Sequence, residues 1–184
     1  MIRIGVLISG TGSNLQALID QLHGREVEIA GVCSNRPDAA GLERARAAGI
    51  ETAVFDDQLA MAGWLAARGV RLVVCAGYMR ILPPAFLQHF GGKVINVHPS
   101  LLPAFKGAHP IEDALAAGAS ETGVTVHWVD EGVDTGSAIA QARVAVNYSE
   151  MPEALRARIH AVEHRLLPTT VRKLARELEA VEEP

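Results

Sequence analysis

The sequence predicts an α/β fold, with a doubly wound, mostly parallel sheet, an antiparallel C-terminal strand pair and a long C-terminal helix. Short β-rich runs alternate with longer segments of helical period through the first half of the chain, which is typical of parallel strands joined by crossover helices. Two further β-rich runs flank an acidic, glycine-containing loop, as in an antiparallel pair. From Ser149 onward, apolar residues recur at helical spacing nearly to the end.

The parallel part is expected to consist of short strands separated by helices. The strands are Ile2–Ile8, Val27–Cys33, Thr52–Phe55, Leu72–Cys75 and Lys93–Val97. The helices are expected at Leu15–Leu22, in the alanine-rich stretch that stops at Gly49, at Leu59–Arg68 and after the Pro83-Pro84 pair. The run Leu72–Cys75 is apolar throughout, which indicates a central strand buried on both faces.

The antiparallel pair is expected at Val124–Val129 and Ala138–Val146. The apolar face of the final helix comprises Leu155, Ile159, Val162, Leu167, Val171, Leu174 and Leu178. Pro168 lies within this segment and is expected to kink or interrupt the helix, because proline cannot donate a backbone hydrogen bond. No repeat or evident linker divides the chain, so the sequence predicts one domain over residues 1–184, with a cleft at the carboxyl ends of the parallel strands.

The composition is typical of a soluble, cytoplasmic protein. The 184 residues include 17 basic and 21 acidic ones, and this mildly acidic balance argues against nucleic acid as a partner. Cys33 and Cys75 lie in apolar runs without CxxC spacing, so buried, reduced thiols are expected. No apolar run is long enough to span a membrane, and no membrane partner is expected. The sequence leaves the oligomeric state open.

The glycine-containing run Ser9–Leu15, SGTGSNL, follows the first strand and opens a helix. Glycines permit a tight turn, and the free N–H groups at a helix start form an anion site. The spacing matches neither the Walker A sequence nor the full GxGxxG fingerprint, so a single phosphate fits better than a pyrophosphate. A bare glycine turn that only packs the helix on the strand explains the run equally well.

A second candidate site lies where the strand Lys93–Val97 ends. Asn96 and His98 are two residues apart, so on a strand they face the same side. An amide donor beside an imidazole is suited to stabilising an oxyanion and transferring a proton. The acidic loop at 130–136 is most simply a solvated turn, but a carboxylate on it that reached His98 would favour the imidazolium form.

Metal and serine chemistry are not expected. His109, His127 and His160 are possible ligands, but the sequence contains no HExxH motif and no Cys/His cluster with metal spacing. Ser13 and Ser100 do not lie in a GxSxG nucleophile elbow.

Several segments together resemble the glycinamide ribonucleotide formyltransferases. They are SGTGSNLQAL near the start, AGYMRIL at 76–82, INVHPSLLPAFKGAH at 95–109, GVTVHWVDEGVDTG at 123–136 and VEHRLLP near the end. The match runs in order over nearly the whole chain. It implies a metal-independent enzyme of purine (IMP) biosynthesis that transfers the formyl group of its co-substrate 10-formyltetrahydrofolate to the amine of glycinamide ribonucleotide.

The resemblance also implies the residues of the site. The catalytic set is Asn96, His98 and Asp134, with His98 as proton donor and oxyanion stabiliser and Asp134 favouring its charged form. The ribonucleotide set is Gly12, Ser13, Asn14, Leu15, Gln16, His160, Ala161, Val162 and Glu163, with Glu163 at the glycinamide end. The folate set is Met79, Arg80, Ile81, Leu82, Asn96, Asp130, Glu131, Gly132, Val133 and Asp134.

The chain departs from the family pattern in two places. The segment VFDDQLAMAGW at 54–64 is shorter than usual and lacks the family's basic folate contact. Ile111 stands where the family often has a histidine.

The same catalytic set also fits a 10-formyltetrahydrofolate hydrolase, for which an additional N-terminal domain is expected. A transfer-RNA formyltransferase would require a C-terminal domain and a more basic surface, and a non-catalytic folate- or nucleotide-binding module would not need all three catalytic residues.

Overall fold

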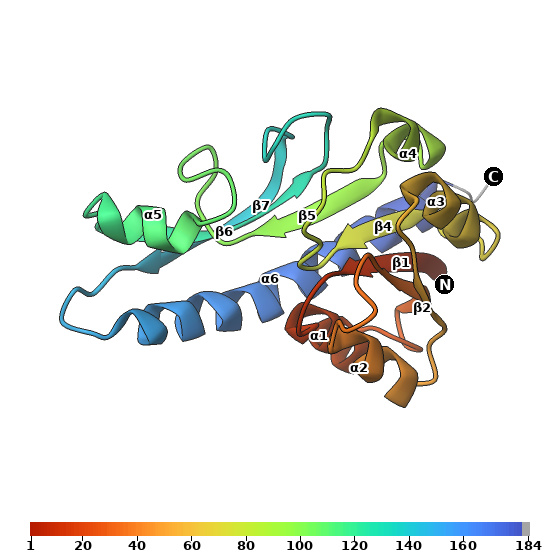
Figure 1. Cartoon of the computed structure of the whole chain (residues 1–184), viewed down its shortest axis with the longest axis horizontal. Coiled ribbons are helices and arrows are strands. Elements are labelled where there is room, and N and C mark those ends of the chain that lie inside the picture. The colour runs from red at the N-terminus through yellow and green to blue at the C-terminus, as the bar shows by residue number, and fades with distance from the viewer. Residues whose placement is uncertain (182–184) are drawn as a thin grey trace.

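The computed structural model describes residues 1–181 and contains one seven-stranded sheet (Figure 1). The strands are β1 (Ile2–Ile8), β2 (Val27–Ser34), β3 (Thr52–Val54), β4 (Leu72–Cys75), β5 (Val94–His98), β6 (Glu121–Trp128) and β7 (Ala138–Ala145). Their spatial order is β3-β2-β1-β4-β5-β6-β7. The pairs among β1 to β5 are parallel, whereas β5 with β6 and β6 with β7 are antiparallel. The predicted fold class is therefore confirmed.

The strand order reverses at β1. The chain first adds β2 and β3 on one side of this strand and then crosses to add β4 on the other side. The loop that leaves the carboxyl end of β1 therefore runs to one face of the sheet, and the loop that leaves β4 runs to the other face. In doubly wound sheets, ligands bind in the crevice between two such loops. Ser9, directly after β1, joins the two loops, since its backbone N–H donates to the Gly77 carbonyl at 2.9 Å and its Oγ accepts from the Met79 N–H at 2.8 Å.

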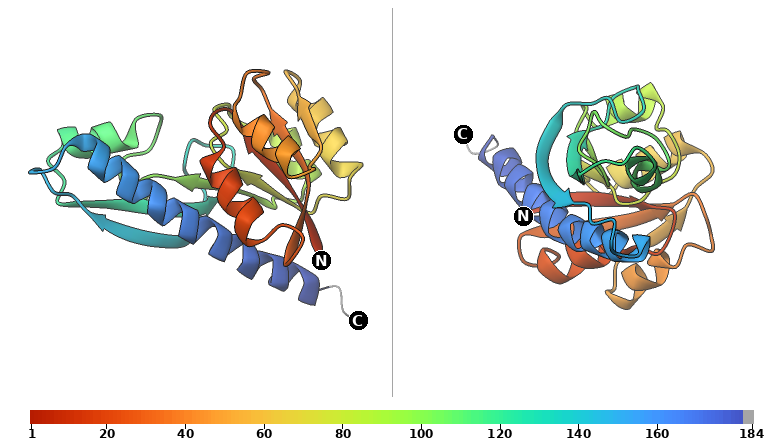
Figure 2. Two further views of the ribbon diagram at one scale, coloured as in Figure 1. Left: turned by 90° about the horizontal axis from the view of Figure 1, so that it is seen from below. Right: turned by 90° about the vertical axis from the view of Figure 1, so that its left-hand side faces the viewer.

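Helices cover both faces of the sheet (Figure 2). They are α1 (Ser13–Gln21), α2 (Gly41–Ala47), α3 (Gln58–Ala66), α4 (Pro84–His89), α5 (Pro110–Ala116) and α6 (Pro152–Ala180). Apolar side chains of α1, α2, α5 and α6 form one buried core with β-strand residues, and those of α3 and α4 form a second core. No helix in residues 1–181 is long and apolar enough to cross a membrane.

Pro168, at which a kink or an interruption was predicted, does not interrupt the last helix. Helix α6 runs continuously from Pro152 to Ala180, a length of roughly 44 Å at the usual rise per residue. Pro168 has no N–H for the His164 carbonyl, four residues earlier. Gln21 of α1 supplies the missing donor, because its Nε2 lies 2.9 Å from the His164 oxygen. A contact from another helix, which sequence periodicity does not reveal, therefore compensates the proline.

The segment between β5 and β6 differs from the sequence expectation in two details. Helix α5 was not among the predicted elements; it begins at Pro110, where proline is favourable in a first helical turn. Strand β6 begins at Glu121, three residues before the predicted Val124. Ile111 is buried in the larger core, so the position at which the family often has histidine serves packing in this chain.

Candidate active site

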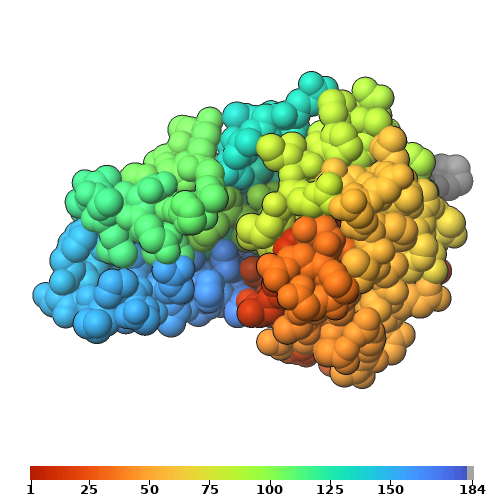
Figure 3. Space-filling model, in the orientation of Figure 1, coloured from red at the N-terminus to blue at the C-terminus, as the bar shows by residue number. Residues whose placement is uncertain are grey.

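A cavity of about 380 Å³ lies beyond the carboxyl ends of β4 and β5. The surface is hollowed there between the segment that follows β4 and the segment that leads into α5 (Figure 3). The lining includes the predicted catalytic and folate residues Met79, Arg80, Ile81, Leu82, Asn96, His98, Asp130, Gly132, Val133 and Asp134. Glu131 was predicted among the folate contacts, but it is exposed and does not line this cavity.

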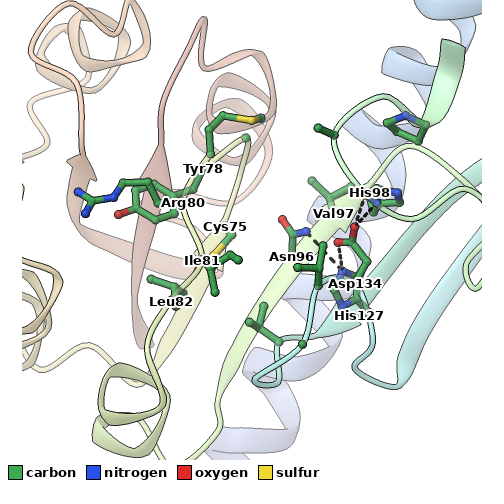
Figure 4. Close-up of a pocket in the computed structure, with 18 of the residues that line it drawn as sticks. Cys75, Tyr78, Arg80, Ile81, Leu82, Asn96, Val97, His98, His127 and Asp134 are labelled. Carbon is green, nitrogen blue, oxygen red and sulfur yellow. Dashed lines mark hydrogen bonds and ion pairs between the residues drawn. The ribbon is translucent and has the colours of Figure 1, made fainter. Parts of the chain in front are cut away.

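His98 is the last residue of β5, and both of its ring nitrogens have partners. Its Nε2 lies 2.9 Å from the Phe105 carbonyl, which can only accept, so the Phe105 contact fixes a proton on Nε2. Its Nδ1 lies 3.5 Å from Asp134 Oδ2 (Figure 4). A bare Nδ1 lone pair would repel the carboxylate, whereas a protonated Nδ1 forms an ion pair with it. His98 is therefore held between a backbone acceptor at Nε2 and the Asp134 carboxylate, which faces Nδ1.

The loop after His98 is held so that it presents the Phe105 carbonyl to the ring. Thr125 Oγ1 on β6 donates to the Ser100 carbonyl at 2.8 Å and accepts from the Leu102 N–H at 3.1 Å. Gln141 on β7 adds a bond from its Nε2 to the Leu102 carbonyl at 2.8 Å. Two antiparallel strands thus fix the loop that orients His98.

Asp134 reaches His98 from the loop between β6 and β7. Its backbone has a φ of 53°, a left-handed conformation in which aspartate is among the better tolerated residues. The Gly107 N–H donates to its Oδ2 at 2.9 Å. Burial acts to raise the pKa of Asp134, but the contact with His127, the Gly107 N–H and the charges of His98 and His127 together lower it below its ordinary value. The carboxyl is therefore kept ionised beside His98.

His127 is a member of this cluster that the sequence suggested only as a possible metal ligand. Antiparallel pairing of β5 and β6 puts His127 opposite Asn96. Its Nδ1 lies 2.8 Å from the Trp128 carbonyl and must donate, and its Nε2 lies 3.3 Å from Asn96 Nδ2. Asp134 Oδ1 lies 3.6 Å from the same Nε2. The sequence does not reveal the register of β5 with β6. That register is the signal that would have identified His127 as a neighbour of Asn96.

The cluster combines an amide donor, an imidazole and an ionised carboxylate at one wall of the cavity. One hydrogen of the Asn96 amide nitrogen is directed to His127, which leaves the second for a group in the cavity. A carbonyl oxygen that develops negative charge is stabilised by such donors, and the His98–Asp134 pair can hold or move a proton.

The predicted phosphate loop adjoins this cavity through Ser9. Gly12 has a φ of +73° and its carbonyl accepts the first helical hydrogen bond of α1, from the Gln16 N–H at 2.9 Å. Within residues 1–181 no side chain caps α1, so the N–H groups of its first turn point to an open helix start. A Cβ on Gly12 would lie 2.6 Å from Gly41 Cα. Gly12 therefore also permits close packing of α2 against the loop.

The two halves of the predicted ribonucleotide set meet between α1 and α6. Asn14 Nδ2 donates to Glu163 Oε2 at 3.2 Å, and both side chains are buried. Burial raises the pKa of Glu163 to about 7, against the opposing hydrogen bond from Asn14. Asn14 Oδ1 is buried and has no partner within the described part of the chain. A buried, unpaired acceptor beside a carboxyl that changes charge near neutrality is typical of a polar ligand site.

The remaining residues of this set take different positions on α6. His160 and His164 stack with ring centroids 6.4 Å apart, and burial lowers the pKa of each ring. Val162 packs against the larger core, and Ala161 is exposed. The structure therefore brings Asn14 and Glu163 into one polar pair, while Val162 has a packing role.

No group of three or more His, Cys, Asp or Glu side chains within residues 1–181 is arranged to hold a metal ion. Cys33 and Cys75 are buried and unpaired, and burial raises the pKa of each thiol to about 12, so neither is a nucleophile near neutral pH.

The fold and this site define a formyltransferase, and the Formyl transferase family profile matches residues 2–171. Phosphoribosylglycinamide formyltransferase of Haemophilus influenzae is 42% identical over 94% of this chain and 86% of its own length. The chain belongs to the phosphoribosylglycinamide formyltransferase family.

Solved structures and longer relatives agree with this membership. The crystal structure of glycinamide ribonucleotide transformylase 1 from Symbiobacterium toebii superposes with a TM-score of 0.91 at 46% identity, covering 96% of this chain and 89% of that one. The trifunctional purine biosynthetic protein adenosine-3 of Drosophila melanogaster is 43% identical over 94% of this chain. The chain spans 14% of the length of that trifunctional protein.

Proposed function

We propose that the chain transfers the formyl group of 10-formyltetrahydrofolate to the amine of N1-(5-phospho-D-ribosyl)glycinamide in purine biosynthesis. The products are the N2-formyl ribonucleotide and tetrahydrofolate. Family membership supports the reaction class, and the names of the relatives support these two substrates. We further propose that residues 1–184 form one cytoplasmic formyltransferase domain that needs neither a metal nor a nucleic acid.

The proposed chemistry is a direct transfer. The amine nitrogen attacks the formyl carbon, a tetrahedral intermediate forms, and the bond from that carbon to the folate nitrogen breaks. Asn96 Nδ2 and the protonated His98 ring stabilise the oxygen while it carries negative charge. The amine loses one proton and the leaving folate nitrogen gains one, with Asp134 assisting that exchange through a water molecule. Orienting both substrates supplies much of the remaining rate.

The observation that carries the proposal is the contact of His98 Nδ1 with Asp134 at 3.5 Å, in a cavity that also contains Asn96. The second substrate has a site beside it, because Ser9 links the loop before α1 to the segment that lines the cavity. A two-substrate transfer requires such adjoining sites.

The test is to incubate the chain with 10-formyltetrahydrofolate, with and without the ribonucleotide, and to measure tetrahydrofolate, formate and formylated ribonucleotide. We expect tetrahydrofolate to form only with the acceptor, in equal amount to the formylated ribonucleotide, and to form equally fast in excess chelator. Release of formate at the same rate without the acceptor would instead identify a hydrolase. Binding of both compounds without any product would identify a binding module.

A further inference from the structure

The short connection between β3 and α3 contacts the segment that lines the cavity. It replaces the longer segment expected from the family pattern. Gln58 Nε2 donates to Tyr78 Oη at 3.1 Å and to the Ile81 carbonyl at 3.0 Å, while Asp57 caps α3 through the Leu59 N–H at 2.8 Å. These contacts fix the connection against one side of the cavity, and they place Asp56 beside that side.

Asp56 forms an ion pair with Arg80. Arg80 Nη1 lies 3.0 Å from Asp56 Oδ1 and 3.0 Å from the Asp56 carbonyl oxygen. The Asp56 side chain is fully exposed, and that of Arg80 is 38% exposed. Among the described residues that line the cavity, Arg80 is the only arginine or lysine. Any anionic group of a ligand that binds Arg80 must therefore compete with the Asp56 carboxylate.

Arg80 lies across the cavity from the His98–Asp134 pair, and its guanidinium is turned away from that pair (Figure 4). The formyl-bearing nitrogen of a folate lies between its pterin and its benzoylglutamate, so two ends extend from a formyl group that faces Asn96 and His98. The benzoylglutamate end carries the carboxylates, and Arg80 is the only arginine or lysine among the described residues that line the cavity. An acidic tail that binds in this cavity is therefore matched in charge by the Arg80 guanidinium.

We propose that Asp56 is a specificity-determining residue that weakens the preference for folates with an acidic tail by occupying Arg80. The inference rests on the proposed function for the identity of the ligand. Asp56 contributes one negative charge where the tail carboxylates bind, so it both neutralises the guanidinium and repels the tail. Replacing it with asparagine removes both effects and keeps the size of the side chain.

The test is calorimetric binding of two probes at low salt. One is tetrahydrofolate, and the other is its truncated analogue with an amide in place of the glutamate. An exposed ion pair has a modest effect, so Asp56→Asn should bind tetrahydrofolate about two- to fivefold more tightly and leave the analogue unchanged. In an Arg80→Gln background, the added Asp56→Asn change should no longer tighten tetrahydrofolate binding. In ~0.5 M salt, the gain in tetrahydrofolate affinity from Asp56→Asn alone should shrink.

Glu51→Gln is the matched control. Glu51 lies just before β3, whereas Asp56 follows this strand, and Glu51 forms its own ion pair with Arg68. Glu51→Gln removes one negative charge from the protein, as Asp56→Asn does. It should leave both affinities unchanged. An equal gain for both probes, a gain that persists without Arg80, or no gain at all would overturn the role of Asp56. If the wild-type chain binds neither probe, the proposed function fails as well, whereas binding of both with no gain refutes only this inference.

Discussion

Asn14 Nδ2 lies 3.2 Å from Glu163 Oε2, although 149 residues separate the two side chains in the sequence. The pair joins the start of α1 to the middle of α6 beside the predicted phosphate loop. Burial leaves the Glu163 carboxyl with a pKa of about 7, against an ordinary 4.5. A group of this kind is unfavourable for the free protein when ionised, and it becomes useful when a ligand supplies a partner.

Glu163→Gln should stabilise the free protein at alkaline pH and weaken ribonucleotide binding. Because its pKa is raised in the folded state, Glu163 lowers the free energy of unfolding as pH rises from about 4.5 to about 7, and this cost is fully present above that range. The variant lacks the cost, so its advantage over wild type should grow between pH 5 and pH 8 to on the order of 1–3 kcal/mol. Denaturant unfolding of both proteins at the two pH values measures it.

Ribonucleotide affinity at pH 8 provides the second readout for the same variant. Loss of a charged hydrogen-bond partner should weaken binding by about tenfold or more. His160 and His164 titrate in both proteins, so the difference between variant and wild type isolates Glu163. A stability difference that is the same at both pH values would show that Glu163 does not titrate as described.

Gly12→Ala should destabilise the fold by about 1–3 kcal/mol, because a non-glycine residue at a φ of +73° is strained and the new Cβ would meet Gly41 Cα at 2.6 Å. Gly10→Ala is the matched control in the same loop, since a Cβ there has no atom within 4 Å among the described residues. Thermal unfolding of the two variants compares them. Equal tolerance of both changes would contradict the close approach of α2 to this loop.

Gln21→Ala should lower the free energy of unfolding by about 0.5–1.5 kcal/mol, because the His164 carbonyl loses the bond from Gln21 Nε2. In a Pro168→Ala background the restored N–H can bond that carbonyl within the helix, so the same Gln21 change should cost less. A double-mutant cycle by denaturant unfolding measures this coupling. Additive effects would mean that Gln21 does not compensate the proline.

The sequence was sufficient for those features that depend on local pattern. Strand β1 and helix α3 were placed to within two residues at each end, because apolar period and turn residues define them. The alternation of Asn96 and His98 on β5 likewise follows from strand geometry. From the residues alone, it could be predicted only that a carboxylate of the loop at 130–136 would affect His98 if it reached the ring. The family resemblance identified that carboxylate as Asp134.

Features created by contacts between distant segments could not be predicted. His127 joins the site through the register of β5 with β6, and the donor from Gln21 to the His164 carbonyl arises from packing of α1 on α6. The Asp56–Arg80 ion pair depends on how a shortened connection closes on a neighbouring loop. Each of these contacts depends on the three-dimensional arrangement of the chain, which the periodicity of a single sequence does not reveal.

His127→Asn should lower kcat by positioning rather than by direct participation. The contact with His127 helps lower the pKa of Asp134, so its loss should move that pKa upward. The acid limb of the kcat profile against pH should then shift to higher pH, with KM for the ribonucleotide little changed. A fall in kcat at all pH values without a shift of that limb would indicate only a structural role.

We propose that Asp134, beside His98, supports proton transfer during formyl transfer. Asp134→Asn keeps the shape of the side chain and its bond from the Gly107 N–H but removes the charge that faces His98. The decisive measurement is kcat of this variant for formyl transfer, combined with its Kd for the ribonucleotide. We expect a kcat lower by ~10² to ~10⁴ with nearly unchanged ribonucleotide affinity. A kcat within about tenfold of wild type would contradict it and make Asp134 an ordinary turn residue.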